Sequence, residues 1–300
     1  MSDARPTTTR PDDFDAYWKE VIAELDATPI AAEEEALPLR SNEFCTAYSV
    51  RFTSIGPYRL FGYLSIPKGE GPFPTLVYLT RCQSVVEIIP QGDANEKRGR
   101  FAVFSLSARG QRMSDQPYAA SYPGAFVEGI EDPRKYLFRG IVADCCRAVD
   151  YAISRPEVDR TRVAGMVAND LPLITSALRG GLTHLIASPD VFYGPMDRLS
   201  GDNGYPLDEF NDYLRAFPDR REVLARTLAY YETLFFAESV KVPALLWGDP
   251  AENAPLGEVM GAGVALQASE HSRYKDGMIQ ENWIAEQFGL PDTILPSHWK

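Results

Sequence analysis

The stretch from Arg162 to Leu178, R-V-A-G-M-V-A-N-D-L-P-L-I-T-S-A-L, decides the fold of this chain. Its segment Val163–Val167 is short and apolar throughout, which is typical of a strand buried on both faces of a sheet. The residues from Leu171 onward have the pattern of a helix, with Pro172 in the first turn. The sharp turn between strand and helix consists of Ala168, Asn169 and Asp170.

The rest of the chain repeats this alternation of strands and helices. Buried strands are predicted at Thr75–Thr80, Ala102–Ser107, Leu185–Ser188 and Ala244–Trp247. A long helix is predicted over Asp132–Arg155, and an antiparallel pair of strands over Phe44–Thr53 and Tyr58–Ile66. Because strands that alternate with helices form a parallel sheet, we predict an α/β fold with a doubly wound, mostly parallel sheet.

Two segments lie outside this alternation. Residues 1–40 are predicted to form an N-terminal helical extension, in which Asp12–Ala27 has one apolar helical stripe and Ala31–Arg40 is an acidic surface connection. Residues 41–300 are predicted to form one α/β domain, with a helical, aromatic-rich insertion at about 198–240. A chain of 300 residues that is 45% hydrophobic is sufficient for one sizeable core.

Charge and composition argue against several classes of partner. The formal net charge is −12 and the pI is about 4.8, which disfavours binding to nucleic acid or to an anionic membrane. No apolar run approaches the roughly 18 residues that cross a bilayer, and the polar N-terminus lacks the apolar segment of a signal peptide. The four cysteines have no metal-ligand spacing. We therefore expect a cytoplasmic protein that acts on a small molecule, without a metal or a cofactor.

Several strings together resemble one enzyme family. They are Arg109-Gly110-Gln111 with Ser114, Gly129-Ile130-x-Asp132-Pro133-Arg134, Pro156-Glu157-Val158-Asp159 and Arg226-Thr227-Leu228-x-Tyr230. These strings resemble the acetyl xylan esterase and cephalosporin deacetylase family, over roughly residues 11–290. The resemblance implies an α/β-hydrolase fold, a Ser–His–Asp triad with an oxyanion hole of backbone N–H groups, and a homo-oligomer of ring-like form. It also implies that Arg109 ties loops together.

The chain departs from the family pattern around the expected catalytic site. An ungapped match puts Asn169 in the place of the nucleophilic serine, and an amide is not a nucleophile. The turn after the first core strand has Arg81 and Cys82 in place of its usual residues, and the acid loop has Ala251 at the aspartate position. The family's histidine corresponds to His271. We therefore expect that the protein does not hydrolyse esters by the family mechanism.

Four residues are candidates for a catalytic role. His271 is the first, because imidazole exchanges protons near neutral pH. Asp170 is either a carboxylate nucleophile, as in the haloalkane dehalogenases and epoxide hydrolases, or an N-cap of the following helix. Asn169 either assists the reaction through its polar amide group or caps the same helix. Glu252 either orients His271 or is an ordinary surface residue.

Four further residues are candidates for substrate binding. Arg81 and Arg112 are cations that would attract an anionic group. Cys82, beside Arg81, is either a reactive thiol or a buried, inert one. Tyr193 belongs to an aromatic set that either lines a pocket or packs a lid or a subunit contact. The set consists of Tyr193, Tyr205, Phe210, Tyr213, Tyr230, Tyr231, Phe235 and Phe236.

Three functions follow as hypotheses. The preferred one is an enzyme that kept the pocket and abandoned serine hydrolysis, such as a lyase, cyclase, isomerase or non-acyl hydrolase. In it, His271 transfers protons on a small, anionic or aromatic metabolite. The second is a non-catalytic pseudoenzyme or ligand-binding protein. The third is a hydrolase with a relocated nucleophile, Asp170 or Cys82. A cavity that His271, Asp170 and Arg81 all reach would support the first or the third.

Overall fold

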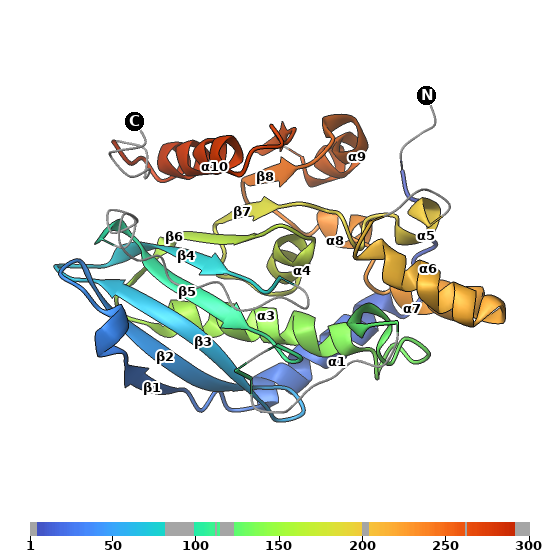
Figure 1. Cartoon of the computed structure of the whole chain (residues 1–300), viewed down its shortest axis with the longest axis horizontal. Helices are drawn as coiled ribbons and strands as arrows, with labels where there is room; N and C mark the ends of the chain where they lie inside the picture. Colours follow the sequence, from blue (N-terminus) through green and yellow to red (C-terminus); the bar gives the residue numbers. More distant parts are fainter. Residues whose placement is uncertain are drawn as a thin grey trace.

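The centre of the molecule is a single mixed sheet. The computed structural model describes residues 5–81, 99–111, 113–114, 123–199, 204–261 and 263–291. Across these residues the sheet has nine strands in the order β1-β2-β3-β5-β4-β6-β7-β8-β9 (Figure 1). The strands are β1 (Glu33–Ala36), β2 (Cys45–Ser54), β3 (Tyr58–Pro67), β4 (Phe73–Tyr78), β5 (Ala102–Ser107), β6 (Val158–Val167), β7 (His184–Ala187), β8 (Ala244–Trp247) and β9 (Val264–Gln267). The pairs from β1 to β5 in this order are antiparallel and the remaining pairs are parallel.

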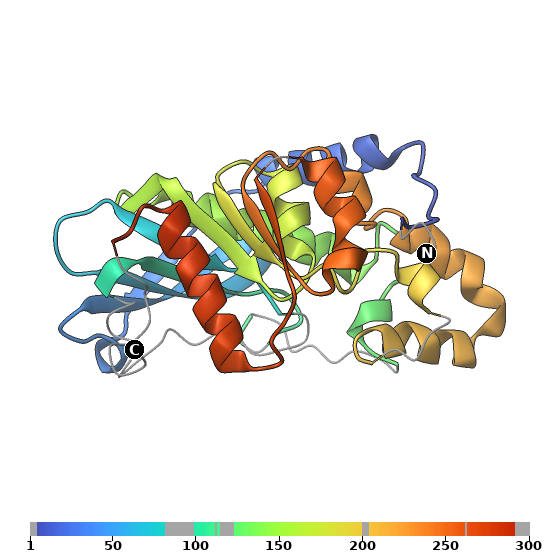
Figure 2. The same ribbon diagram turned by 90° about the horizontal axis from the view of Figure 1, so that it is seen from above.

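Helices cover both faces of this sheet, which confirms the doubly wound α/β fold. α10 (Arg273–Gln287) lies over one face, whereas α1 (Phe14–Ala27), α3 (Leu137–Ser154) and α4 (Leu171–Leu178) lie over the other (Figures 1 and 2). The other helical segments are η1 (Pro38–Arg40), η3 (Ala125–Val127), α5 (Pro195–Arg198), α6 (Leu207–Ala216), η4 (Pro218–Arg220), α7 (Arg221–Leu228), α8 (Leu234–Ala237) and α9 (Pro250–Met260).

The continuous apolar strands are explained by burial on both faces. Successive side chains of a strand point to opposite faces, so each core strand supplies residues to two cores. Leu76 of β4 packs in the core that contains Ile284 and Phe288, on the α10 side. Its neighbour Val77 belongs to the larger core on the side of α1 and α3. A polar residue at either position would lie in one of the two cores.

Two predicted elements differ from the structure. The acidic segment Ala31–Arg40 contains β1, which pairs with β2 through its backbone while all four of its side chains are exposed. Its composition therefore concealed an edge strand, because charged side chains are common on such edges. The helix predicted from Asp132 begins only at Leu137, since the backbone N–H groups of Lys135 and Tyr136 donate to the Asp132 carbonyl in a preceding turn.

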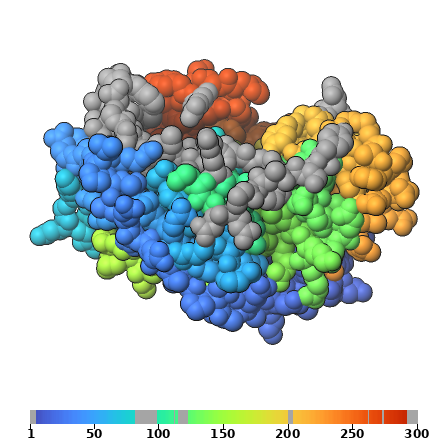
Figure 3. Space-filling view, turned by 60° about the horizontal axis from the view of Figure 1, so that its bottom comes forward, coloured from blue at the N-terminus to red at the C-terminus, as the bar shows by residue number. Residues whose placement is uncertain are grey.

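The aromatic residues of the predicted insertion mostly pack in the core. The rings of Tyr231 and Phe236 lie edge-on to Trp18 of α1, with centroids 5.3 and 5.6 Å away. Phe210 of α6 lies edge-on to Phe126 of η3, and Figure 3 shows these gold and green segments side by side at one end of the molecule. Because α1 shares the main core, its packing links the N-terminal segment to the sheet. The division at residue 40 and the bounds of the insertion stay predictions.

Arg109 ties α3 to the turn after β2, whereas the resemblance implied that it ties loops together. Its Nε and Nη2 atoms donate to the Asp144 carboxylate at 2.9 and 2.8 Å, and Nη2 also donates to the Ile55 carbonyl at 3.0 Å. Gly140 provides the space, because a Cβ atom there would lie 2.2 Å from the guanidinium. Arg109 is therefore a structural residue.

Two further expectations concern single segments. Cys145 and Cys146 are buried in α3 and are not in a disulfide, and burial raises the pKa of Cys146 to about 12. Among the described helices, none combines the length and the apolar character needed to span a bilayer.

Candidate functional site

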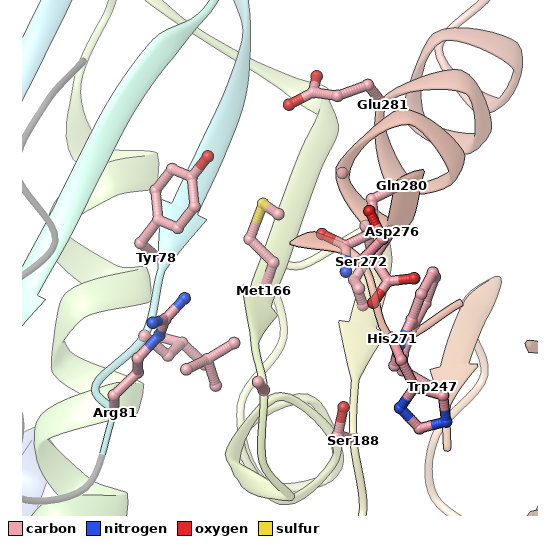
Figure 4. Close-up of a pocket in the computed structure, with 15 residues that line it drawn as sticks. Tyr78, Arg81, Met166, Ser188, Trp247, His271, Ser272, Asp276, Gln280 and Glu281 are labelled. Carbon is pink, nitrogen blue, oxygen red and sulfur yellow. The ribbon is translucent and has the colours of Figure 1, made fainter. Parts of the chain in front are cut away.

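A pocket of about 530 Å³ lies where β4, β6, β7 and β8 end and α10 begins (Figure 4). In open α/β sheets, ligands bind at the carboxyl ends of the parallel strands. One wall is apolar and consists mainly of sheet residues, whereas the opposite wall is polar and comes from the start of α10. The sheet side includes Tyr78, Met166, Ile186, Ser188 and Trp247, and the α10 side includes His271, Ser272, Asp276, Gln280 and Glu281.

The turn between β6 and α4 meets this pocket through Ala168. Ala168 is exposed and lines the pocket, whereas Asn169 is only 4% exposed. The Asn169 amide donates to the Thr80 carbonyl at 3.0 Å, and its oxygen accepts from the Leu171 backbone N–H at 2.9 Å. Asn169 therefore ties the segment after β4 to the first residue of α4, although the N-cap position of this helix belongs to Asp170. The ungapped match puts Asn169 in the serine position, whereas Ala168 is the residue of the turn that lines the pocket.

Asp170 is fully buried and does not line the pocket. Its carboxylate accepts from the Val191 backbone N–H at 2.8 Å and from the Thr233 hydroxyl at 2.6 Å. Burial raises the pKa of Asp170 to about 6, and these hydrogen bonds oppose the rise. Asp170 precedes α4, but its side chain holds more distant segments instead of capping the helix. The structure thus corrects its placement as an exposed nucleophile.

His271 lies in the loop between β9 and α10 and lines the pocket. Its backbone has a φ of +50°, a left-handed conformation that is uncommon for a residue with a side chain. Non-glycine residues held in this region cluster at functional sites. His184, in contrast, packs edge-on against Phe288 and lies outside the residues that line the pocket. The two described histidines therefore differ in environment, and only His271 lines the pocket.

Ser188 is a pocket residue that the sequence analysis missed. It directly follows β7, next to the turn after β6, and is 6% exposed. Its backbone N–H donates to the Asn169 carbonyl at 3.2 Å, and its carbonyl accepts from Asp190 at 2.8 Å. Figure 4 shows the Ser188 side chain and the His271 imidazole at the same end of the pocket. The available signal was its place at the carboxyl end of a core strand, where ligand-binding residues gather.

Glu252 and Tyr193 lie in a different pocket, of about 310 Å³, together with Asp190 and Asp249. Glu252 is an exposed residue of α9, and it is absent from the residues that line the His271 pocket. Burial raises the pKa of Tyr193 to about 12. The structure therefore does not bring Glu252 to His271. Among the described residues, no group of three or more His, Cys, Asp or Glu side chains is placed to hold a metal ion.

The remaining candidates are cationic or thiol residues near the end of β4. Arg81 lines the His271 pocket on the side of Tyr78, across the pocket from His271 (Figure 4). Its carbonyl accepts from the Gln111 side chain at 2.7 Å, which fixes the chain at this point. Cys82 and Arg112 lie outside the described residues. The described site thus combines His271 and Arg81, but neither Asp170 nor Glu252.

Three features together define an α/β-hydrolase-fold protein. They are the mostly parallel sheet, the strand–turn–helix at its centre and the histidine loop after the last strand. The family model for acetyl xylan esterase (AXE1) matches residues 1–249. The chain therefore belongs to the acetyl xylan esterase family.

Individual relatives agree with this assignment. The acetyl esterase Axe7A of Xylanibacter ruminicola is 25% identical over 259 residues, which are 81% of this chain, and the chain spans 57% of that relative's length. The structure of an acetyl xylan esterase from Paenibacillus sp. R4 superimposes with a TM-score of 0.81 at 22% identity, covering 95% of this chain and 97% of the other. Acetyl xylan esterase 1 from Thermoanaerobacterium sp. JW/SL YS485 also has a TM-score of 0.81 at 22% identity, with 94% and 96% covered. The two structures support the fold.

This family membership corrects the functional expectation. The hypotheses of a lyase, cyclase, isomerase or non-acyl hydrolase and of a non-catalytic protein are wrong, because the matching family and relatives are described as acetyl esterases. The hypothesis of a hydrolase that uses Asp170 or Cys82 stays untested by these comparisons. The comparisons do not show that the chain has lost its nucleophile. The expectation rested on the turn after β6 alone, whereas Ser188, which follows the neighbouring strand, also lines the pocket.

Proposed function

We propose that the protein hydrolyses acetyl esters of a carbohydrate in the pocket between the sheet and α10. The observation that carries the proposal is that Ser188 and His271 line this one pocket, with both side chains at the same end of it (Figure 4). The acetyl esterase relatives support the bond that is cleaved. An apolar wall with Tyr78 and Trp247, opposite a polar wall from α10, supports a ligand that has both apolar faces and hydroxyl groups.

The proposed reaction uses Ser188 as the nucleophile and His271 as the general base. His271 removes the Ser188 proton while the Oγ atom attacks the acetyl carbonyl carbon, and a tetrahedral intermediate forms. The intermediate collapses, the ester C–O bond breaks and the sugar oxygen takes the proton from His271. Water, deprotonated by His271, then attacks the acetyl-serine and releases acetate and free Ser188.

Arg81 is the proposed source of charge stabilisation in this reaction. The tetrahedral intermediate carries a negative oxygen, and a group of positive potential near that oxygen lowers the barrier. Arg81 lines the same pocket as Ser188 and reaches into it from the end of β4. The proposal thus gives a role to two of the sequence candidates, His271 and Arg81.

Steady-state kinetics with p-nitrophenyl acetate and an acetylated xylo-oligosaccharide tests this function. We expect Ser188→Ala and His271→Ala each to lower kcat/KM by about 1,000-fold, the scale of losing a nucleophile or its base. Ser239→Ala, which changes an exposed serine remote from the pocket, should have wild-type kinetics. Labelling with a fluorophosphonate and peptide mapping should find the adduct on Ser188. Absence of acetate release by the wild type from both substrates, or full activity of Ser188→Ala, overturns the proposal.

A further inference from the structure

The loop that carries His271 is organised around one carboxylate of α10. Asp276 Oδ2 accepts a hydrogen bond from the Ser269 hydroxyl at 2.7 Å, and Oδ1 accepts from the Glu270 backbone N–H at 2.8 Å. Ser269 Oγ in turn accepts from the His271 backbone N–H at 3.0 Å. Two steps of hydrogen bonding therefore connect Asp276 with the backbone of His271.

We propose that Asp276 is a positioning residue, which holds His271 in its left-handed backbone conformation and so directs the imidazole into the pocket. The role in catalysis rests on the function proposed above for His271. Among the described residues, the Asp276 oxygens bond to the Ser269 hydroxyl and the Glu270 N–H, so Asp276 acts on the backbone of the loop and not in proton transfer.

The backbone of His271 makes such support necessary. A residue with a Cβ atom at φ = +50° has a less favourable local energy than in the extended or helical regions, so neighbouring contacts have to maintain it. The N–H groups of Glu270 and His271 both point back toward the Asp276–Ser269 pair. If this pair were lost, the loop would relax to a more common conformation, and the side chain of residue 271 would move.

Asp276 is itself fixed at the start of α10. Its backbone N–H donates to the Ser272 carbonyl at 2.9 Å, and Ser272 is the N-cap of this helix. A carboxylate in the first turn of a helix is favoured by the helix dipole. Lys275 lies next to Asp276 but pairs with Glu270, at 3.6 Å between Nζ and the carboxylate. The Asp276 carboxylate is thus directed to the loop by both the helix and its neighbours.

The structure also separates this role from direct contact with substrate. Asp276 lines the pocket, whereas Ser269 does not, so Ser269→Ala breaks the connection to His271 without changing a pocket side chain. Asp276→Asn keeps an oxygen acceptor for the Glu270 N–H. Glu286→Gln is the matched control, because it removes the same charge from an exposed position of α10 away from the pocket.

Hydrogen exchange and kinetics test the proposal in the full chain. In Asp276→Ala and Ser269→Ala, the Glu270 or His271 amide should exchange about tenfold faster, because its acceptor is lost. In the same variants kcat for p-nitrophenyl acetate should fall about 10- to 100-fold, as expected for a misplaced catalytic group, with KM within threefold of the wild type. Asp276→Asn should lie between Asp276→Ala and the wild type, and Glu286→Gln should match the wild type.

Nuclear magnetic resonance of the three histidine rings, His184, His271 and His298, gives a readout that does not require activity. The His271 ring signals should move in Asp276→Ala while the His184 signals stay in place. Unchanged His271 signals and amide exchange in that variant would overturn the positioning role. An inactive wild type, by contrast, would overturn the proposed function, whereas the exchange and ring signals would still decide whether Asp276 positions His271.

Discussion

Two connections at the carboxyl edge of the sheet differ in how they use polar residues. In the turn after β6, Asn169 and Asp170 are buried and their side chains bond to Thr80, Leu171, Val191 and Thr233. In the loop after β9, His271 is exposed to the pocket and has a left-handed backbone. The polar groups of the first connection hold the fold together, whereas the second presents a group to the pocket.

This difference shows that residue type alone does not identify a catalytic group. A buried acid whose oxygens accept hydrogen bonds from surrounding segments is a structural element, even beside a pocket. An imidazole held at the pocket by an unfavourable backbone conformation has the opposite character. The two connections therefore make different predictions for stability and for accessibility.

The largest expected effect is that of Asp170→Ala on stability. The substitution leaves the Val191 N–H and the Thr233 hydroxyl buried without their acceptor, so we expect a loss of about 4 kcal/mol in the free energy of unfolding. Urea denaturation followed by circular dichroism measures this loss. Asp219→Ala, at an exposed position, is the control and should change stability by less than about 0.5 kcal/mol. A loss below about 1 kcal/mol for Asp170→Ala would contradict its structural role.

The second expected effect is a pH dependence of stability that arises from Glu232, a residue whose charge interacts with that of Asp170. Its carboxylate accepts from the Gly194 N–H at 3.0 Å, and burial raises its pKa from 4.5 to about 8. Between these two values the folded protein retains a proton that the unfolded chain has released, so stability falls as the pH rises. At 1.4 kcal/mol per pH unit, the loss due to Glu232 from pH 6 to pH 7.5 is about 2 kcal/mol.

Glu232→Gln isolates this contribution, because glutamine keeps an acceptor for the Gly194 N–H and does not titrate. The free energy of unfolding of the variant should decrease less than that of the wild type over the same pH range. Parallel pH profiles for the two proteins would exclude Glu232 as the source of the dependence. The pH profile of the variant still contains the contribution of Asp170, whose pKa is also raised by burial.

The fold could be predicted from the sequence because its pattern is dictated by burial. Segments such as Ala102–Ser107 and Ala244–Trp247 are apolar throughout, since both faces of the central strands are covered, and the structure has strands at these residues. The edge strand β1 could not be recognised in this way. Its side chains are exposed, and the backbone pairing with β2 leaves no hydrophobic pattern in the sequence.

The candidate site could be predicted only in part. His271 and Arg81 follow, or lie near, strand ends that the sequence pattern located, and both line the pocket. The orientation of Ala168, Asn169 and Asp170 in a three-residue turn depends on contacts with Thr80, Val191 and Thr233, which are distant in the sequence. Ser188 came to the pocket through the order of strands in the sheet, which one sequence does not specify.

The smallest expected effect on stability belongs to a pair of cysteine substitutions in the turn after β6. Their labelling rates show which residue of that turn faces the pocket. Ala168 is exposed to the pocket and Asn169 is not. In a Cys82→Ser background, Ala168→Cys should therefore react readily with a maleimide. Asn169→Cys should react about 100-fold more slowly, because its reaction requires local unfolding. Ala168→Cys should also change the free energy of unfolding by less than about 0.5 kcal/mol, since the added atom enters open space. The remaining native thiols, Cys45, Cys145 and Cys146, are buried, and the background protein serves as their control. Fast labelling of Asn169→Cys together with slow labelling of Ala168→Cys would reverse the assignment, and would show that position 169 is the residue of the turn that is presented to substrate.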